Sequence, residues 1–206
     1  MVSEGQRYAS VVRHFRRTRG VRRCSDGAWL KLGTQGLEGV VYISRDRTRV
    51  LKKVIVSLEE DPISRFEAME LVNLAASALG VCPRVHGVHY ELDARGVLFF
   101  CIESDYFDGV TLGELLSSSS GKVACRKVEP MVRALVRKMI RGGVWHGDLH
   151  ADNVLVRTDL SEVTFVDFGN GCFCFGKEKN KVAADAGLEA LCLRKLDLRK
   201  EEIRGA

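Results

Sequence analysis

The chain contains the stretch His146-Gly147-Asp148-Leu149-His150-Ala151-Asp152-Asn153, and Asp167-Phe168-Gly169 follows it after a short hydrophobic segment. In between, residues 154–156 and 163–166 are two apolar runs separated by a turn. This pattern predicts a β-hairpin that brings Asn153 close to Asp167. Carboxylate and amide oxygens are hard ligands that suit Mg²⁺. We therefore expect the oxygen-bearing side chains of the two stretches to meet at one end of the hairpin.

The order of these residues resembles the catalytic part of the protein-kinase-like superfamily. In that family an aspartate accepts the proton of the acceptor hydroxyl, an asparagine five residues later binds metal, and the aspartate of D-F-G binds metal again. The resemblance implies that Asp148 is the catalytic base, that Asn153 and Asp167 are metal ligands, and that ATP and Mg²⁺ are the cofactors. It covers roughly Leu30 to Gly169, and its catalytic part is the more specific.

The second residue of the motif departs from the commonest kinase form. Gly147 stands where most protein kinases carry an arginine that pairs with a phosphorylated activation loop. Glycine at this position is found in the RIO kinases, in the small kinase of the tRNA-threonylcarbamoylation complex, and in aminoglycoside and choline phosphotransferases. Compact effector kinases of pathogens are similar in size. We therefore do not expect control through such phosphorylation.

Upstream, the alternating stretch Trp29 to Leu32 predicts a strand that enters a glycine-rich turn. Glycines there let backbone N–H groups approach phosphate oxygens, because no Cβ blocks them. An ordinary hairpin would contain the same glycines, so the turn alone leaves both interpretations open. The kinase loop keeps its last three fixed positions in this chain, whereas its first glycine is displaced by one residue. The resemblance implies that the nucleotide contacts here are Gly33, Gly36, Gly39 and Val41.

The next predicted strand, residues 49–56, carries two adjacent lysines. Its segment Val50-Leu51-Lys52 resembles the kinase strand whose lysine grips the α- and β-phosphates of ATP. Because side chains alternate along a strand, only one of the two lysines can reach a nucleotide. We favour Lys52, which shares a face with Val50 and Val54, and expect Lys53 to face solvent.

A helical pattern over residues 62–79 follows this strand. In kinases the corresponding helix carries a glutamate that pairs with the lysine and aims it at the phosphates. Glu67 and Glu70 are both available, one turn apart. The resemblance implies a pair between Lys52 and one of them, and we favour Glu70 because it lies nearer the middle of the helix.

Residues 97–102 are almost continuously apolar, which predicts a central strand. The residues after it resemble the kinase hinge, and the resemblance implies backbone contacts of Asp105 to Phe107 with adenine. Helical patterns over residues 128–140 and 183–196 would support a second lobe. Asp185, in the second of these helices, is a candidate brace for the catalytic loop.

The predicted fold is α+β and bilobal, protein-kinase-like, with a β-rich N-lobe and a truncated helical C-lobe. We expect residues 1–28 to be a basic N-terminal extension, residues 29–104 the N-lobe, and residues 105–206 the hinge and truncated C-lobe. The truncation is expected because the residues after Gly169 include no proline, so that an A-P-E segment is absent.

The formal net charge is +5, and arginines crowd the N-terminal region. They are Arg13, Arg16, Arg17, Arg19, Arg22 and Arg23. Such a cluster could bind an acidic partner, nucleic acid or an anionic membrane surface, or could be a solvated face of a helix. No run approaches the ~20 apolar residues of a membrane span, and the first residues do not resemble a secretory signal. We expect an intracellular protein, cytoplasmic or nuclear, or placed in a host cell if it comes from a pathogen.

The seven cysteines are odd in number and lie mostly in apolar runs, which is typical of reduced core thiols. Cys172 and Cys174 are one residue apart, and this does not match the paired spacing of a structural zinc site. No thiolate metal site is expected from the spacing.

The function that these observations favour is that of a minimal ATP- and Mg²⁺-dependent serine/threonine protein kinase, which transfers the γ-phosphate to a protein hydroxyl. Protein is favoured as the acceptor because the C-lobe lacks the extra helices that enclose a small substrate. One alternative is a small-molecule phosphotransferase of the aminoglycoside or choline kinase type. Another is a pseudokinase that acts as a binding module, for RNA or for an acidic partner.

Overall fold

A computed structural model of the chain describes residues 3–23, 29–36, 39–58, 61–118 and 121–174. The chain forms two compact units. The first comprises residues 1–71 and 84–106, and the second comprises residues 72–83 and 107–206. Strands and helices occur in both units, which confirms the predicted α+β class.

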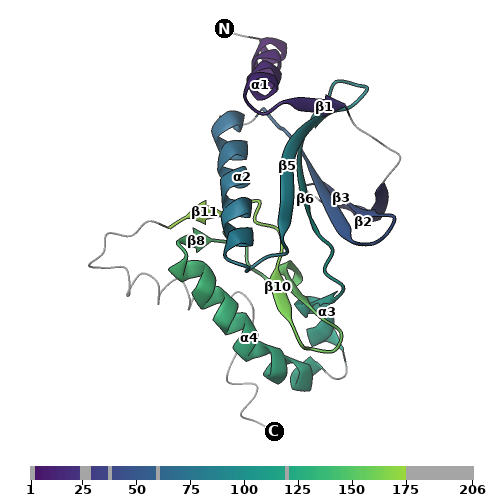
Figure 1. Cartoon of the computed structure of the whole chain (residues 1–206), viewed down its shortest axis with the longest axis vertical. Helices are drawn as coiled ribbons and strands as arrows, with labels where there is room; N and C mark the ends of the chain where they lie inside the picture. Colours follow the sequence, from purple (N-terminus) through teal and green to yellow (C-terminus); the bar gives the residue numbers. More distant parts are fainter. Residues whose placement is uncertain (1–2, 24–28, 37–38, 59–60, 119–120, 175–206) are drawn as a thin grey trace, which may run out of the picture. The chain divides into compact units, whose positions relative to one another are not determined.

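The first unit is built on a six-stranded sheet with the strand order β1-β5-β6-β4-β3-β2 (Figure 1). These strands are β1 (Val21–Arg23), β2 (Trp29–Gly36), β3 (Gly39–Ser44), β4 (Arg49–Ile55), β5 (Val85–Leu92) and β6 (Leu98–Asp105). Neighbours are antiparallel except β1 and β5, which are parallel. The apolar strand β6 lies between β5 and β4, and its predicted central position is confirmed.

The hairpin of β2 and β3 contains the glycine-rich turn. Gly36 of β2 pairs with Gly39 of β3, and the register shifts between Leu32 and Gly36. A Cβ on Gly39 would lie 2.4 Å from the carbonyl oxygen of Lys53, so only glycine lets β3 approach β4 this closely. The two strands predicted on either side of the glycine-rich turn are therefore confirmed.

The helix α1 (Glu4–Thr18) begins with a capping box. The Ser3 hydroxyl accepts the Gln6 amide at 3.3 Å, and the Gln6 side chain accepts the Ser3 amide at 3.0 Å, which satisfies two donors at the helix start. The predicted apolar face of the helix, with Val11, Val12 and Phe15, is buried. Residues that the sequence placed in a basic extension thus contribute a helix to the hydrophobic core of the first unit.

That core joins α1 and the first part of α2 (Pro62–Ala78) to one face of the sheet (Figure 1). Phe15 is fully buried and stacks on Tyr90 of β5, with 4.0 Å between ring centroids. Tyr90 in turn meets Phe100 of β6 edge-on at 5.4 Å. Aromatic pairs of this kind add to the free energy gained by burial.

The second unit combines helices with short strands. Its elements are α3 (Leu112–Ser117), α4 (Gly121–Arg141), β7 (Val110–Thr111), β8 (Val144–Trp145), the 3₁₀ turn η1 (Ala151–Asn153), β9 (Val154–Val156), β10 (Val163–Phe165) and β11 (Cys172–Phe173). β10, β9 and β7 form one antiparallel sheet, and β11 pairs with β8. The β9–β10 hairpin is the one that the sequence predicts, with Val156 opposite Val163.

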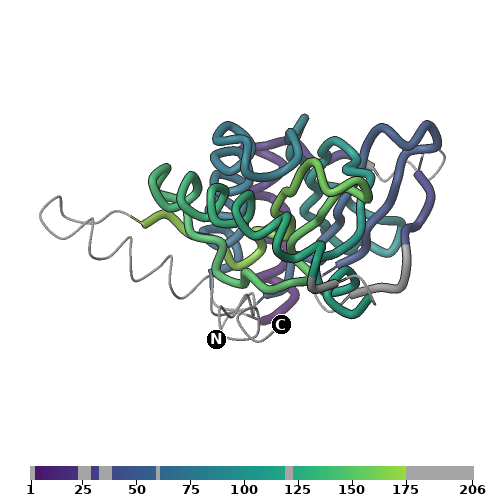
Figure 2. Tube along the Cα trace, turned by 90° about the horizontal axis from the view of Figure 1, so that it is seen from below, coloured from purple at the N-terminus to yellow at the C-terminus, as the bar shows by residue number. Residues whose placement is uncertain are grey.

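The long helix α4 packs against β8 and β10 (Figure 2). It begins at residue 121, earlier than its apolar pattern predicts, and its fully buried residues include Val132, Val136 and Met139. The predicted helix over residues 183–196 and its Asp185 lie outside the described residues. Within the described ranges, no helix is both long and apolar enough to cross a membrane.

The burial of α1 makes a testable prediction about Phe15. Replacing Phe15 with alanine removes a fully buried ring, so the free energy of unfolding should fall by about 3–5 kcal/mol. Arg13→Ala, at an exposed position of the same helix, is the matched control and should change the stability by less than about 0.5 kcal/mol. Denaturant unfolding of both variants measures the difference. Equal effects would show that α1 is not part of the core.

Candidate functional site

The imidazole of His146, the first residue of the loop 146–153 that follows β8, is fully buried. Its Nε2 is 2.8 Å from the carbonyl oxygen of Val166, so Nε2 carries the proton and donates it. Its Nδ1 then accepts the backbone amide of Asp148 at 3.4 Å. One neutral ring therefore joins the start of the loop 146–153 to the end of β10.

The surroundings of His146 favour this neutral form. Burial lowers the pKa of the imidazole, and the hydrogen bond to the Val166 carbonyl opposes that shift only in part. The ring of Phe168 lies 4.4 Å from the imidazole, and the ring of Phe165 meets it edge-on at 6.3 Å. The aromatic residue of the D-F-G motif is thus part of the packing that keeps His146 dry.

Gly147 occupies a position that no other residue type fits. Its φ is +81°, in the left-handed region that L side chains rarely adopt. A Cβ there would lie 1.9 Å from the carbonyl oxygen of Asn170. The departure from the commonest kinase motif therefore has a local cause, because the backbone after the D-F-G motif passes directly against residue 147.

The side chain of Asn153 is oriented by its neighbours. Its Nδ2 donates to the carbonyl oxygen of Asp148 at 2.9 Å and lies 3.0 Å from Nε2 of His150. With both hydrogens of the amide nitrogen directed at these partners, Oδ1 points away from them. Oδ1 is the atom that a metal ligand needs, and the role of Asn153 as a ligand stays a prediction.

Asp167 follows immediately after the hairpin. The backbone amide of Val166 donates to the carbonyl oxygen of Asn153 at 3.0 Å, so Asn153 and Asp167 lie at the same end of the hairpin, as the sequence predicts. Asp167 has a φ of +66°, unusual for a residue with a side chain, and its Oδ1 accepts the Gly169 amide at 3.3 Å. Non-glycine residues in this conformation concentrate at functional sites.

His150 is a site residue to which the sequence assigned no role. Its Nε2 lies 3.8 Å from a carboxylate oxygen of Asp148 and accepts from the Asn153 amide. Its Nδ1 lies 3.7 Å from a carboxylate oxygen of Asp152. His150 therefore contacts both the predicted base and the predicted metal ligand. The signal in the sequence was its position two residues after Asp148.

In the first unit, two predicted nucleotide contacts lie side by side. Val41 of β3 is opposite Lys52 of β4, and Lys52 is opposite Ile102 of β6. Opposed residues of neighbouring strands share a face, and this face of the sheet also carries the core that packs against α1 and α2. Lys52 is half-buried there. Gly33 lies within β2, Gly36 ends this strand, and Gly39 begins β3.

The expectation that Lys53 faces solvent is wrong. Lys53 is 8% exposed, its ammonium group pairs with a carboxylate oxygen of Glu91 on β5, and it lies 5.4 Å from the ring centroid of Tyr42. Lys52 and Lys53 do lie on opposite faces, as alternation requires. The error arose because the second face of β4 also holds a buried partner, which comes from a distant part of the sequence.

Both candidate glutamates of α2 pair with α1. Glu70 accepts a hydrogen bond from Nε of Arg19 at 3.1 Å, and Glu67 is 3.1 Å from Nε2 of His14. The predicted pair between Lys52 and Glu70 stays a prediction. Arg19 is a partner of Glu70 that sequence reasoning missed, because α1 and α2 are far apart along the chain.

Two backbone amides of the predicted hinge are hydrogen-bonded to other parts of the protein. The amide of Asp105 donates to the carbonyl oxygen of Arg84 at 2.9 Å, and the amide of Tyr106 donates to that of Thr48 at 2.9 Å. The side chain of Phe107 is 9% exposed and lies under the guanidinium group of Arg157, at 4.8 Å. The amides of Asp105 and Tyr106 are therefore engaged within the protein, and the adenine contacts of residues 105–107 stay a prediction.

Comparison with known families identifies a kinase-like domain. The family model described as the ABC1 atypical kinase-like domain matches residues 87–186. The matched range contains the whole loop 146–153 and the D-F-G motif, with the hydrogen bonds described above. Residues 87–186 are thus similar to a domain of the protein-kinase-like superfamily, which fits an atypical kinase-like protein. A search of curated proteins found no match.

The match also settles the fold. The sheet, α2 and the hairpin of this kinase-like chain form a mixed α+β fold of the kinase-like type, as the sequence predicts. The matched range begins within β5 and so leaves out the glycine turn and Lys52. Recognition therefore rests on the catalytic part, which is also the part that the sequence identified as the more specific.

Gly147 gives a prediction with a control in the same unit. Gly143 has a φ of +73°, but a Cβ there would be 3.6 Å from its nearest neighbour, the Cys174 carbonyl. Gly143→Ala should therefore cost only the backbone strain, about 1–2 kcal/mol. Gly147→Ala should cost about 1–3 kcal/mol more than Gly143→Ala, because its Cβ also collides with the carbonyl oxygen of Asn170. Thermal unfolding compares the two, and equal costs would contradict the close approach.

His146 predicts a pH dependence of stability. Its pKa in the folded protein lies below the ordinary value of about 6.5 because the ring is buried, so the unfolded chain binds its proton first as the pH falls. The contribution of the neutral ring is complete above about pH 6.5 and is lost as the pH falls through the folded pKa. The free energy of unfolding should therefore decline less steeply below this pH in His146→Gln than in the natural chain. Denaturant unfolding at a series of pH values measures both slopes, and parallel curves would exclude a neutral buried His146.

Proposed function

We propose that the chain is an ATP- and Mg²⁺-dependent kinase that transfers the γ-phosphate to a serine or threonine hydroxyl of a protein. The observation that carries the proposal is the arrangement around Asn153. Its amide nitrogen is held by the Asp148 carbonyl, and its backbone oxygen is held by the amide next to Asp167. The predicted base and both predicted metal ligands are thus fixed with respect to one another.

Each of the three residues has a defined task in this proposal. Phosphoryl transfer needs an aligned acceptor and neutralised charge rather than covalent help from the protein. The oxygens of Asn153 and Asp167 would hold Mg²⁺, which supplies the neutralising charge at the phosphates. The Asp148 side chain is 49% exposed and would accept the proton of the incoming hydroxyl.

His150 would act on Asp148 rather than on the nucleotide. Its Nε2 faces the Asn153 amide nitrogen at 3.0 Å, and its Nδ1 accepts the backbone amide of Asp152 at 3.3 Å, so the ring is held from both sides. Held in this way, the ring lies beside the Asp148 carboxylate, with 3.8 Å between Nε2 and the nearest carboxylate oxygen. We assign His150 the role of a positioning residue.

The first unit would supply the nucleotide contacts. Lys52 would bind the α- and β-phosphates, and the β2–β3 turn with Gly33, Gly36 and Gly39 would offer amides to the phosphates. The Asp105 carbonyl and the Phe107 amide would bind adenine, since the amides of Asp105 and Tyr106 are engaged. Val41, opposite Lys52, would provide an apolar contact.

The pairing of Glu70 with Arg19 affects how Glu70 could orient Lys52. A glutamate that binds Arg19 through one carboxylate oxygen keeps a second oxygen for a lysine. We propose that Lys52 and Arg19 share Glu70. We also propose that the exposed residues Arg13, Arg16 and Arg17 of α1 bind an acidic partner or nucleic acid.

A binding experiment tests the nucleotide part of this proposal. ATP with Mg²⁺ should raise the thermal unfolding temperature, and the shift should shrink with EDTA and in Asp167→Ala, because a ligand stabilises the state that binds it. If nucleotide causes no shift under any condition, the chain is not a kinase. A shift without phosphoryl transfer to any acceptor would identify a pseudokinase.

Catalysis is tested by labelled ATP with the purified protein and generic protein acceptors. Lys52→Met should lower the transfer rate by at least ~100-fold, as loss of one preorganised charge does. Lys53→Met is the matched control, which should weaken folding through the unpaired Glu91 but leave the rate per folded molecule within a few fold. The opposite ranking would reassign the phosphate-binding lysine. Turnover only with an aminoglycoside, choline or a sugar would replace the protein acceptor by a small molecule.

A further inference from the structure

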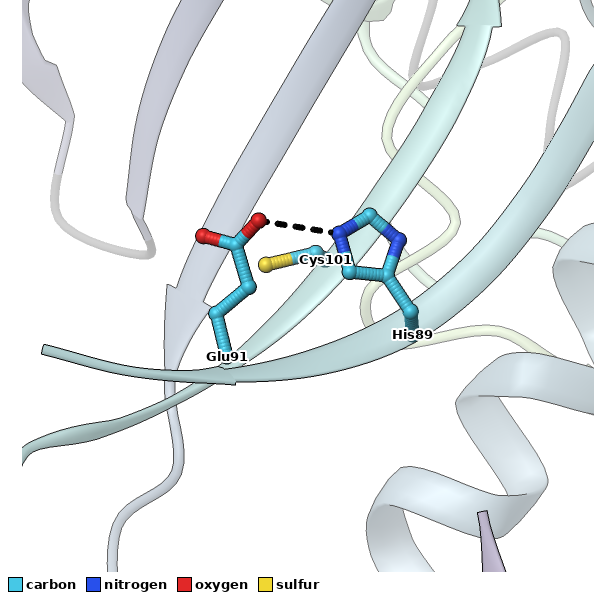
Figure 3. A group of neighbouring side chains, drawn as sticks. All are labelled: His89, Glu91 and Cys101. Carbon is cyan, nitrogen blue, oxygen red and sulfur yellow. Dashed lines mark hydrogen bonds and ion pairs between the residues drawn. The ribbon is translucent and has the colours of Figure 1, made fainter. Parts of the chain in front are cut away.

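Three metal-ligating side chains meet on the face of the sheet opposite to the core with α1 and α2. His89 and Glu91 lie two residues apart on β5 and so point to the same side, and Cys101 of β6 is opposite His89 in the register. Figure 3 shows the Cys101 side chain between the other two. Their donor atoms all lie within 4.8 Å of one another.

This group is enclosed by the protein. Cys101 is fully buried and Glu91 is 5% exposed, whereas His89 is half-buried. Oε1 of Glu91 is 3.0 Å from Nε2 of His89, so a carboxylate oxygen and an imidazole nitrogen already face the same point. Two strands that are neighbours at the centre of the sheet provide the ligands, and these strands are rigid supports.

Lys53 completes the arrangement from β4. It is opposite Cys101 in the register, and its ammonium group binds the second carboxylate oxygen of Glu91. A carboxylate held on one oxygen by a donor presents its other oxygen in a fixed direction, which is how outer partners orient metal ligands. Glu91 is therefore restricted to binding an ion through Oε1 alone.

We propose that His89, Glu91 and Cys101 form a binding site for one divalent ion of the zinc type. Imidazole nitrogen, carboxylate oxygen and thiolate sulfur together suit zinc, whereas a thiolate disfavours Mg²⁺. Water would occupy the fourth position. When the ion binds, the Cys101 thiol loses its proton to solvent and a sulfur–metal bond forms, with no change of oxidation state.

The ion would join β5 to β6 and so stabilise the first unit. It is separate from the proposed Mg²⁺ site, which uses Asn153 and Asp167 of the second unit. The site could not be found by the spacing of cysteines, because it contains one cysteine and takes its other ligands from the neighbouring strand.

Cobalt titration of the full chain, with no nucleotide present, tests the proposal. Co²⁺ bound to a thiolate gives a sulfur-to-metal charge-transfer band, which we expect to saturate at one equivalent and to disappear on addition of Zn²⁺. Cys101→Ser should abolish the band. Absence of the band in the natural chain at micromolar protein would overturn the proposal.

A double variant tests whether Co²⁺ binds to thiols other than that of Cys101. Cys172 begins β11 and is exposed, and Cys174 directly follows this strand, so among the described cysteines these two are a competing pair of thiols. Cys172→Ser with Cys174→Ser should keep the band and its stoichiometry. A band that is lost in this double variant and kept in Cys101→Ser would assign the ion to β11 instead.

A second variant is needed because Cys101 is buried and its replacement could impair folding. His89→Gln, at a half-buried position, should keep the fold by circular dichroism but weaken Co²⁺ binding at least ~10-fold, since it removes a ligand. Zn²⁺ should raise the unfolding temperature of the natural chain and not that of His89→Gln. Equal rises in both would contradict coordination by His89.

Discussion

The neutral imidazole of His146 is the contact on which the site depends. It donates to the Val166 carbonyl and accepts the Asp148 amide, so a single ring fixes the distance between the loop and the end of β10. A doubly protonated ring could not accept the amide, and burial among Phe165 and Phe168 disfavours that charge. Asp148 and the strand that leads to Asp167 therefore keep their relation as long as the ring stays neutral.

The need for glycine at position 147 follows from the same packing. With His146 tied to Val166, the chain after the D-F-G motif passes so close to residue 147 that a Cβ would collide with the Asn170 carbonyl. An arginine cannot occupy this backbone position, which explains why the chain has the glycine form of the motif.

The sequence predicted those parts that depend on local patterns. The β9–β10 hairpin, the central strand β6 and the apolar face of α1 each follow from the alternation or spacing of a few neighbouring residues. The contacts that it missed join distant segments. Arg19 with Glu70 and Lys53 with Glu91 are examples, since the partner is found only when helices and strands are assembled. The motif around Asp148 could be recognised, but the place of His150 in it could not.

The same limit applies to the ligands on β5 and β6. His89 and Glu91 look like polar residues of an ordinary strand, and only the register with Cys101 brings a thiol beside them. Recognition of the kinase-like family likewise rests on residues 87–186, which contain the motif residues that are close in sequence. Contacts within short loops can thus be predicted from the sequence, whereas contacts between strands that are distant along the chain cannot.

The protonation state of His146 tests the central claim most directly. Long-range ¹H–¹⁵N correlation spectra of the histidine rings distinguish a protonated Nε2 from a protonated Nδ1 and from an imidazolium. We predict that His146 is protonated at Nε2 only at neutral pH, and that it gains its second proton at a lower pH than an unperturbed histidine does. A proton on Nδ1, or an imidazolium at neutral pH, would contradict the hydrogen bonds to Asp148 and Val166 and with them the account of the site.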